Sequence, residues 1–323
     1  MNMKKLELVS AFADQIKDFL GYREKCGIKN IHKEYQFYRK LDQFILKEKI
    51  ENISFTKEQA SLWRMLLENE SEKGRYNRIN HTKKFFEYLF TKGYNVFQFR
   101  DVKSPKSSFT PHIYNDDEIN RYFKAVDSYQ CNINRKNCVQ LPVLFRILYC
   151  CGTRITETLM IRKKDVDMEQ GIIKLSDTKN AKERYVVMSD SLLSLMKLYA
   201  DKTFYQIPDT GYIFRNSKDT CFSGDWINEV HIRILQEAKI PYIGGGKGPR
   251  VHDWRHVFSI NSFKQMMDNG MDMYVALPIL STYLGHKSIM ATERYLRLTV
   301  SMYPSIEKKF GKILDEIFGE VEI

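Results

Sequence analysis

Apolar side chains recur at helical spacing through the first hundred residues of the chain, with charged residues between them. A surface helix buries one face when its apolar residues stand three or four positions apart. Four such faces are present: Phe12, Ile16, Phe19 and Leu20; Tyr35, Tyr38, Leu41 and Ile45; Leu62, Met65 and Leu66; and Ile79, Phe86 and Phe90. Thr56 and Gln59 form a candidate capping box before the third helix, and Gly93 ends the fourth. The pattern predicts four short helices.

The rest of the chain mixes helical patterns with short runs of β character. Asn115 is a candidate cap for a helix at 116–129, and the apolar run Leu141–Cys150 is typical of a buried helix. Two strands are predicted at 172–176 and 184–188 around a turn, and a short one at 212–214. Further helices are expected at 191–199 and 222–239. We therefore predict a mainly α fold with a small β-hairpin or sheet.

A polar stretch at residues 101–111 separates these two patterns. It contains lysine, serine and proline without hydrophobic periodicity, which is typical of a linker. A chain of 323 residues is also long enough for two hydrophobic cores. We predict a helical domain at 1–100, a linker at 101–111 and a second domain at 112–323.

Composition argues against a membrane protein and favours a polyanionic partner. The sequence contains no run of 18 apolar residues, and its N-terminal segment mixes charged with apolar residues, unlike a signal peptide. The six cysteines form no CxxC pair, which favours free thiols in a reducing cytoplasm. The formal charge is +11, and residues 1–110 carry 22 lysines and arginines against 14 acidic residues. Such an excess attracts nucleic acid without sequence preference.

Candidate chemistry is concentrated between Val251 and Arg297. The segment begins with His252, Arg255 and His256, continues to a Leu-Gly-His turn at 284–286, and reaches Tyr295 nine residues later. Residues three apart on a helix share a face, so a histidine and an arginine there can address one phosphate. A tyrosine hydroxyl becomes an effective nucleophile toward a phosphate whose charge arginines neutralise.

Parts of this region also have the residue types of two other kinds of site. His252 and His256 have metal-ligand spacing, and His252-Asp253 is a candidate metal dyad. Arg255 would place a cation beside that metal, and no matching carboxylate cluster follows in the sequence. The glycine-rich stretch at 243–248 lacks the GxxxxGK[ST] pattern of a phosphate loop. We therefore expect neither a metal nor a nucleotide cofactor.

The order HxxRH, LGH and Tyr resembles the C-terminal catalytic block of the tyrosine recombinase (phage integrase) family. Upstream, CGTRITETL at 151–159 resembles the family's TGLRISEL box, and TKNAKERYVV at 178–187 resembles GKGNKERxVP. The resemblance covers about residues 112–300. It departs from the family between Arg255 and Leu284, where the segment is longer and carries four methionines around Gly270. We interpret that stretch as an extended helix and loop for packing or subunit contact.

The resemblance implies catalytic roles for Arg154, Lys179, His252, Arg255, His286 and Tyr295. The two arginines and His286 would bind the scissile phosphate, and Tyr295 would attack it to form a 3′-phosphotyrosyl link. Lys179, preferred over Lys182, would protonate the leaving 5′ oxygen, and His252 would be the general base. His256 is expected to support this site or to pack, and Glu157 to buttress Arg154 or to begin a helix favourably.

Tyr283 and Tyr303 are rival nucleophiles by residue type. Tyr283 precedes the Leu-Gly-His turn and is expected in the core. Tyr303 lies before a proline and too far along the chain.

The same resemblance implies double-stranded DNA as the partner and a C-shaped clamp made by a core-binding and a catalytic domain. Seven basic residues of the first domain are candidate DNA contacts: Lys33, Arg39, Lys40, Arg75, Arg78, Lys83 and Lys84. An apolar helical stripe between Ile306 and Ile317 is a candidate docking helix for a neighbouring protomer. The resemblance implies that the protein is a monomer or weak oligomer when free and forms a homo-tetramer on paired DNA sites.

The expected function is site-specific recombination that integrates or excises a mobile element. The alternatives are a DNA-relaxing enzyme of the type IB topoisomerase kind and a non-catalytic DNA-binding relative.

Overall fold

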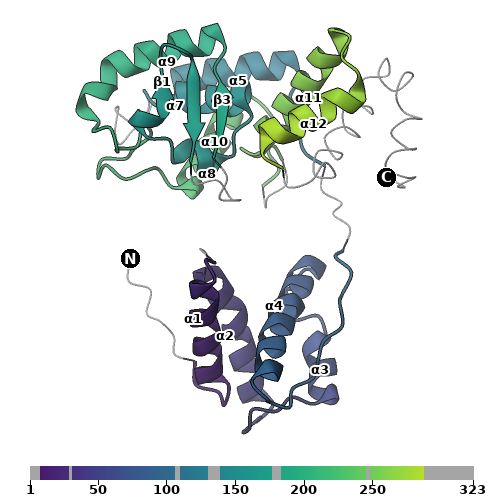
Figure 1. Cartoon of the computed structure of the whole chain (residues 1–323). Helices are drawn as coiled ribbons and strands as arrows, with labels where there is room; N and C mark the ends of the chain where they lie inside the picture. The colour runs from purple at the N-terminus through teal and green to yellow at the C-terminus, as the bar shows by residue number, and fades with distance from the viewer. Residues whose placement is uncertain are drawn as a thin grey trace. The chain divides into compact units, whose positions relative to one another are not determined.

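In a computed structural model the chain forms two compact units, Met1–Phe109 and Thr110–Ile323, each described here by itself (Figure 1). The structure describes residues 8–28, 31–105, 110–129, 139–176, 183–244 and 248–286, without the side chains of residues 32 and 33. Among these residues, no helix combines the length and apolar character needed to cross a membrane.

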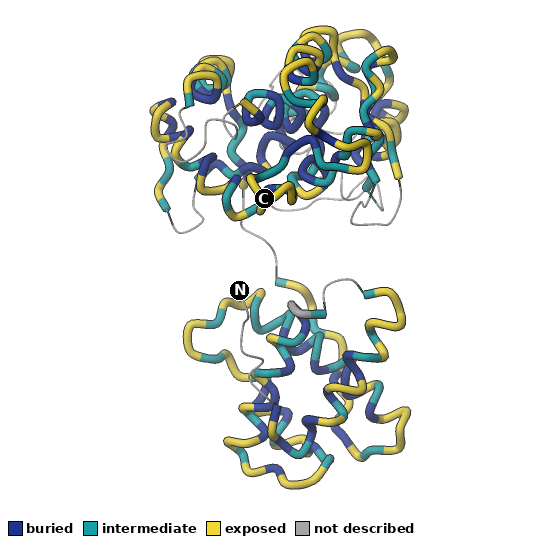
Figure 2. The backbone as a smooth tube through the Cα atoms, turned by 90° about the vertical axis from the view of Figure 1, so that its left-hand side faces the viewer, coloured by how far each residue is buried: buried dark blue, intermediate teal, exposed yellow. Residues whose placement is uncertain are grey.

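The first unit contains four helices around an aromatic core, as the spacing of apolar residues predicts. They are α1 (Ala13–Lys25), α2 (Ile31–Lys47), α3 (Lys57–Arg64) and α4 (Glu72–Thr91). α1, α2 and α4 pack against one another, and their buried faces appear as dark blue segments in Figure 2. Phe12, Phe19 and Phe85 are almost completely buried, and the ring of Phe85 contacts the rings of both Phe12 and Phe19.

The start of α3 confirms its predicted capping box, but the predicted apolar face is wrong. Thr56 accepts a hydrogen bond from the Gln59 backbone, and the Gln59 side chain bonds the Thr56 backbone in return. The helix buries Ala60 and Trp63, whereas the three residues expected inside are exposed: Leu62, Met65 and Leu66. The indole of Trp63 decides the orientation, because it donates to Thr82 and packs under the guanidinium of Arg78.

Along α4, the apolar spacing predicts the buried side correctly except at its end. Ile79 and Phe86 are buried, whereas Phe90 is exposed. Phe90 lies one residue before the last of the helix, where Leu89 and Phe85 already fill the core.

The second unit is built around α7 (Leu141–Cys151), the apolar helix predicted from the sequence. Its buried residues contact α5 (Asp116–Ser128), α9 (Asp190–Thr203) and α11 (Asp253–Asp268). The predicted cap of α5 is present, since Asn115 and Glu118 exchange hydrogen bonds with each other's backbone. Among these neighbours, α11 packs against α7, although about a hundred residues separate the two helices in the sequence.

One small antiparallel sheet accompanies these helices, with strands in the order β1 (Val166–Asp167), β2 (Ile172–Leu175) and β3 (Arg184–Val187). Ile173 pairs with Val186, so both fill the core at this register. The strand expected at 212–214 is reduced to a single bridge between Arg162 and Tyr212. The prediction was wrong there because Ile213 and Phe214 serve as buried packing residues next to a turn.

Two helices replace the extended helix and loop expected after Arg255. They are α11 and α12 (Met273–Leu284), and they turn at Gly270, whose φ is +80°. The methionines fill the contact between them: Met273 is buried, and Met266, Met267 and Met271 pack against the same cluster. The helix α10 (Gly224–Glu237) completes the unit against α5.

Candidate active site

The first candidate arginine follows a left-handed turn at the end of α7. Gly152 caps that helix with φ +58°, a conformation that favours glycine, and an added Cβ would lie 2.2 Å from the ring of Phe258. Arg154 comes two residues later as the N-cap of α8 (Ile155–Leu159). The tight turn therefore sets the point at which Arg154 enters the site.

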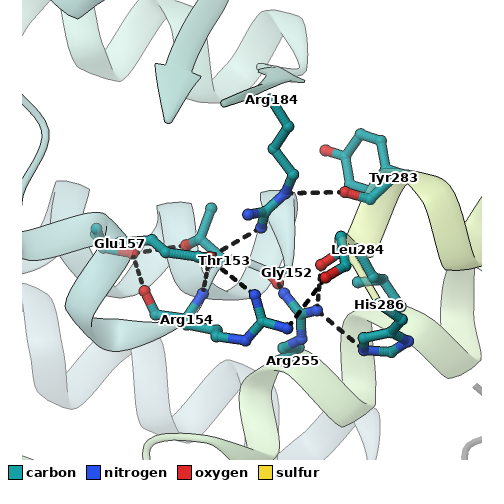
Figure 3. Close-up of polar contacts among 11 residues, drawn as sticks. Gly152, Thr153, Arg154, Glu157, Arg184, Arg255, Tyr283, Leu284 and His286 are labelled. Carbon is teal, nitrogen blue, oxygen red and sulfur yellow. Dashed lines mark hydrogen bonds and ion pairs between the residues drawn. The ribbon is translucent and has the colours of Figure 1, made fainter. Parts of the chain in front are cut away.

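Glu157 holds the side chain of Arg154 in place (Figure 3). One carboxylate oxygen accepts a hydrogen bond from Nη1 of Arg154 at 2.7 Å, and the other accepts from the Arg154 backbone N–H at 2.9 Å. Burial alone would raise the pKa of Glu157, but hydrogen bonds and charge from Arg184 and Arg154 lower it to about 2. Glu157 therefore both buttresses Arg154 and begins its helix.

The second candidate arginine, Arg255, lies in the first turn of α11 and is only 1% exposed. Its Nη1 donates to the carbonyl of Gly152 at 2.7 Å, and its Nη2 donates to the carbonyl of Leu284 at 2.5 Å. These carbonyls belong to two turns separated by more than a hundred residues in the sequence. A single buried guanidinium thus joins the turn before Arg154 to the turn before His286.

The imidazole of His286 is placed by the second of these turns. Gly285 ends α12 with φ +66°, and Nη2 of Arg255 lies 3.1 Å from Nε2 of His286. Burial, and then the charges of Arg255 and Arg154, lower the pKa of His286 to about 4. The ring is therefore neutral at pH 7, and because a guanidinium only donates, Nε2 is the acceptor and Nδ1 carries the proton.

His252 stands immediately before α11, with its ring 5.4 Å from that of His256. Its pKa falls to about 4 because surrounding protein displaces water and because Arg255 and Arg250 are nearby. The ring is therefore neutral at pH 7, and the residue keeps an exposed surface from which a substrate can be reached. A neutral imidazole can accept a proton, as a general base must. His256 is buried in the first turn of α11.

Asp253 is engaged in a way that does not suit the metal dyad considered for His252-Asp253. Its buried carboxylate accepts hydrogen bonds from the Arg250 backbone at 3.0 Å, the Arg250 guanidinium at 3.1 Å and the His112 backbone at 3.3 Å. These donors occupy both oxygens and place a cation where a metal would stand. Within the described ranges, no group of three or more histidine, cysteine, aspartate or glutamate side chains could hold a metal ion.

The remaining predicted catalytic residues, Lys179 and Tyr295, lie outside the described residues, as do Lys182, Tyr303 and the stripe at 306–317. Tyr283 is described, and its half-buried ring stacks on Phe258 at 5.4 Å between centroids. Burial raises the pKa of its hydroxyl well above the usual value, which makes it a poor nucleophile. Its position fits the expected packing role.

Arg184, which the sequence patterns did not single out, also reaches this site. It donates from Nε to the Tyr283 carbonyl at 3.0 Å and from Nη2 to Glu157 at 2.9 Å (Figure 3). Its partners lie 99 and 27 residues away in the sequence, so no local spacing reveals them. The only available signal was an arginine at the end of the basic turn that carries Lys179.

The candidate DNA contacts of the first unit fall on α2 and α4, and one of them is misassigned. Arg78 is 1% exposed, and its guanidinium is paired with Glu70 at 2.7 Å and donates to backbone carbonyls, so it is not available on an outer face. Lys40 and Lys84 are exposed, and Arg39 is partly exposed. Arg75 pairs with Glu72, and Lys83 pairs with Asp101 and Glu87. The side chain of Lys33 lies outside the description.

Together, Arg154, Arg255 and His286 form a compact group of donors suited to one phosphate. Nη2 of Arg154 lies 3.5 Å from the Gly285 carbonyl, so its guanidinium reaches the turn that carries His286. Guanidinium donors bind phosphate oxygens in fixed, often bidentate geometry, and a neutral imidazole adds a directional hydrogen bond. The group can bind a phosphodiester and stabilise extra negative charge on it.

Comparison with known proteins gives one consistent result. The model of the phage integrase family matches residues 113–302. A probable integrase/recombinase protein of Methanocaldococcus jannaschii is 30% identical over 188 residues, which are 54% of this chain and 53% of that protein. The tyrosine recombinase XerC of Staphylococcus saprophyticus is 25% identical over 225 residues, 69% of this chain and 70% of that protein.

Solved structures show the same fold. The site-specific recombinase XerH bound to a palindromic difH substrate gives a TM-score of 0.66 at 17% identity, covering 87% of this chain and 80% of that one. A Tn1549 transposon integrase in complex with transposon right end DNA gives 0.62 at 16% identity, covering 87% and 93%. The chain spans about half the length of the Methanocaldococcus relative and 61% of a putative integrase/recombinase of Sinorhizobium fredii.

Proposed function

Because this chain belongs to the phage integrase family, we propose that it is a site-specific DNA recombinase that cuts and rejoins strands through a 3′-phosphotyrosyl intermediate. One observation supports this function most directly. Arg154, Arg255 and His286 come from three separate segments, and the hydrogen bonds of Arg255 to the Gly152 and Leu284 carbonyls gather them at one point. A packing role alone does not require two guanidinium groups and a neutral imidazole on one small surface.

The proposed reaction begins with the scissile phosphate bound by Arg154, Arg255 and the Nδ1 proton of His286. The hydroxyl oxygen of Tyr295 attacks phosphorus as its proton passes to His252, and the bond from phosphorus to the 5′ oxygen breaks. Lys179 gives a proton to that oxygen, leaving a free 5′-hydroxyl and a 3′-phosphotyrosyl bond. The 5′-hydroxyl of a partner duplex then reverses the same steps, because one phosphoester bond has been exchanged for another.

Double-stranded DNA is the proposed partner, contacted by exposed basic residues of the first unit and by the phosphate-binding group of the second. Strand exchange between two duplexes needs two protomers at each site, so we propose that a free monomer or weak oligomer assembles into a homo-tetramer on paired sites. The proposed biological role is the integration or excision of a mobile element. Sedimentation of the protein with and without DNA carrying paired sites measures this assembly.

The function is tested with a suicide substrate, a duplex nicked so that the short 5′ fragment diffuses away after cleavage. The recombination site is first selected by covalent capture from a random-sequence duplex library with the wild-type protein. The wild-type protein is expected to form a covalent protein–DNA complex, whereas Tyr295→Phe forms none and keeps its affinity for DNA. Tyr283→Phe is the matched control and is expected to cleave normally. A covalent complex that persists in Tyr295→Phe would contradict the assignment.

A further inference from the structure

Arg184 ties three separate segments of the second unit together at the candidate site. It is the first residue of β3, its Nη2 bonds Glu157 in α8, and its Nε bonds the Tyr283 carbonyl at the end of α12 (Figure 3). Its Cδ also lies 3.3 Å from the point where a Cβ on Gly285 would stand. The turn that presents His286 is therefore packed directly against this arginine.

The carboxylate of Glu157 is shared between two guanidinium groups. Its side chain is only 1% exposed, and it lies 2.7 Å from Nη1 of Arg154 and 2.9 Å from Nη2 of Arg184. A buried carboxylate with too few partners is costly, and it would draw its remaining cation more tightly. With Arg184 as a second partner, Glu157 stays ionised while Arg154, whose side chain is 19% exposed, keeps an edge for another anion.

Arg184 also contributes a positive charge to the phosphate-binding group. The three arginines Arg154, Arg184 and Arg255 and the single carboxylate of Glu157 leave two net positive charges at this group. A phosphodiester carries one negative charge, and attack by a phenolate oxygen gives a phosphorane with two. Without Arg184, only the proton gained by His252 would offset the second negative charge, so Arg184 adds positive charge where the transition state needs it.

One nitrogen of Arg184 has a donor to spare. Nη1 is buried and has no hydrogen-bond partner in the part of the chain that the structure describes. Buried donors on charged groups are nearly always paired, and exceptions occur at functional positions. A side chain that only stabilised the hairpin would not need a buried, unpaired N–H beside the site.

We propose that Arg184 is a positioning residue of the recombinase, which acts through Glu157 and the Gly285 turn to hold the phosphate-binding groups in place. This inference rests on the proposed function, since it concerns how that reaction is catalysed. Arg184 does not touch the scissile phosphate in this role. Because Arg184 holds Arg154 in place through Glu157, removing Arg184 should weaken the stabilisation of negative charge on the phosphate, as removing Arg154 does.

The experiment compares single-turnover formation of the covalent complex on two suicide substrates. One carries an ordinary scissile phosphodiester, and the other carries a methylphosphonate, in which a methyl group replaces one charged oxygen. Arg184→Met is expected to slow cleavage of the phosphodiester about 100-fold, the size of the loss of one preorganised electrostatic contact. On the methylphosphonate, which needs less positive charge, the loss should shrink to about 10-fold or less, as it should for Arg154→Ala.

Three further measurements separate positioning from stability. Arg184→Lys retains the charge without the forked geometry of the guanidinium. Its rate of phosphodiester cleavage should lie between those of the wild type and Arg184→Met. The double variant Glu157→Gln/Arg184→Met should cleave less slowly than the product of the two single-variant rate losses predicts, because both substitutions break the same Glu157–Arg184 ion pair. The matched control is Lys174→Met, which removes an exposed 2.9 Å ion pair to Glu183 beside the same hairpin and should cleave both substrates normally.

Each outcome decides the matter. Equal losses on the two substrates, or no loss in Arg184→Met, would overturn the positioning role. If Arg184→Met does not fold, as judged by its circular dichroism, the comparison between substrates is made with Arg184→Lys. A wild-type protein that forms no covalent complex on the phosphodiester would instead refute the proposed function, so the two failures are distinct.

Discussion

Substituting Gly152 by alanine tests the turn on which both candidate arginines depend. The residue has φ +58°, and its added Cβ would lie 2.2 to 2.9 Å from three atoms of the Phe258 ring. Left-handed backbone costs a non-glycine residue about 1–2 kcal/mol, and overpacking a well-filled site costs about 1–3 kcal/mol more. We therefore expect Gly152→Ala to lower the free energy of unfolding of the second unit by about 2–5 kcal/mol.

Gly270→Ala is the matched control for the backbone term. Gly270 lies in the same unit with φ +80°, and a Cβ there would meet nothing within 4 Å. This variant should lose only about 1–2 kcal/mol. Adding Phe258→Leu to Gly152→Ala removes the ring and should recover part of the excess loss, giving a positive coupling in a double-mutant cycle. Urea unfolding followed by tryptophan fluorescence measures the wild type, the single variants Gly152→Ala, Gly270→Ala and Phe258→Leu, and the double variant. Equal losses for the two alanine variants, or no recovery with Phe258→Leu, would refute the steric reasoning.

Two further predictions concern acid and metals. His231 is 2% exposed, bonds the hydroxyl of Tyr122 at 2.7 Å, and has a pKa lowered to about 4 by burial, so the unfolded chain binds its proton before the folded one. His231 should therefore lower the free energy of unfolding by about 1.4 kcal/mol for each pH unit as the pH drops from about 6.5 toward 4. Urea unfolding across that range should show a shallower slope in His231→Gln, and an unchanged slope would contradict the prediction. DNA cleavage should continue in EDTA, because arginines supply the charge stabilisation that a metal would otherwise give; cleavage that stops and returns with a divalent ion would favour the metal-dyad hypothesis.

The local parts of this structure follow from the sequence, and the parts set by distant partners do not. The caps at Thr56 and Asn115 were predictable because a capping box needs only two residues three positions apart. The hairpin at 172–188 was predictable from alternation and a polar turn. By contrast, α3 turned its other face inward because Trp63 found partners on α4, which no spacing within α3 records.

The same limit explains the two arginines that were misjudged. The sequence predicts Arg78 as a surface cation, yet it is buried against Glu70 and Trp63. Arg184 was not singled out, yet it bonds Glu157 and the Tyr283 carbonyl. A sequence shows that an arginine is present and where basic residues gather. It does not show which carboxylate the fold will bring to it, and that pairing decides whether the charge is available to DNA.

The position and polarity of the covalent bond test the central claim most directly. The wild-type protein is trapped on a suicide substrate and digested with protease and nuclease, and the peptide that carries a nucleotide is sequenced by mass spectrometry. We predict a single nucleotide-bearing peptide, with the modification on Tyr295, linkage to the 3′ phosphate, and a free 5′-hydroxyl on the released strand. A nucleotide on Tyr283 or Tyr303, or a bond to a 5′ phosphate, would contradict the account.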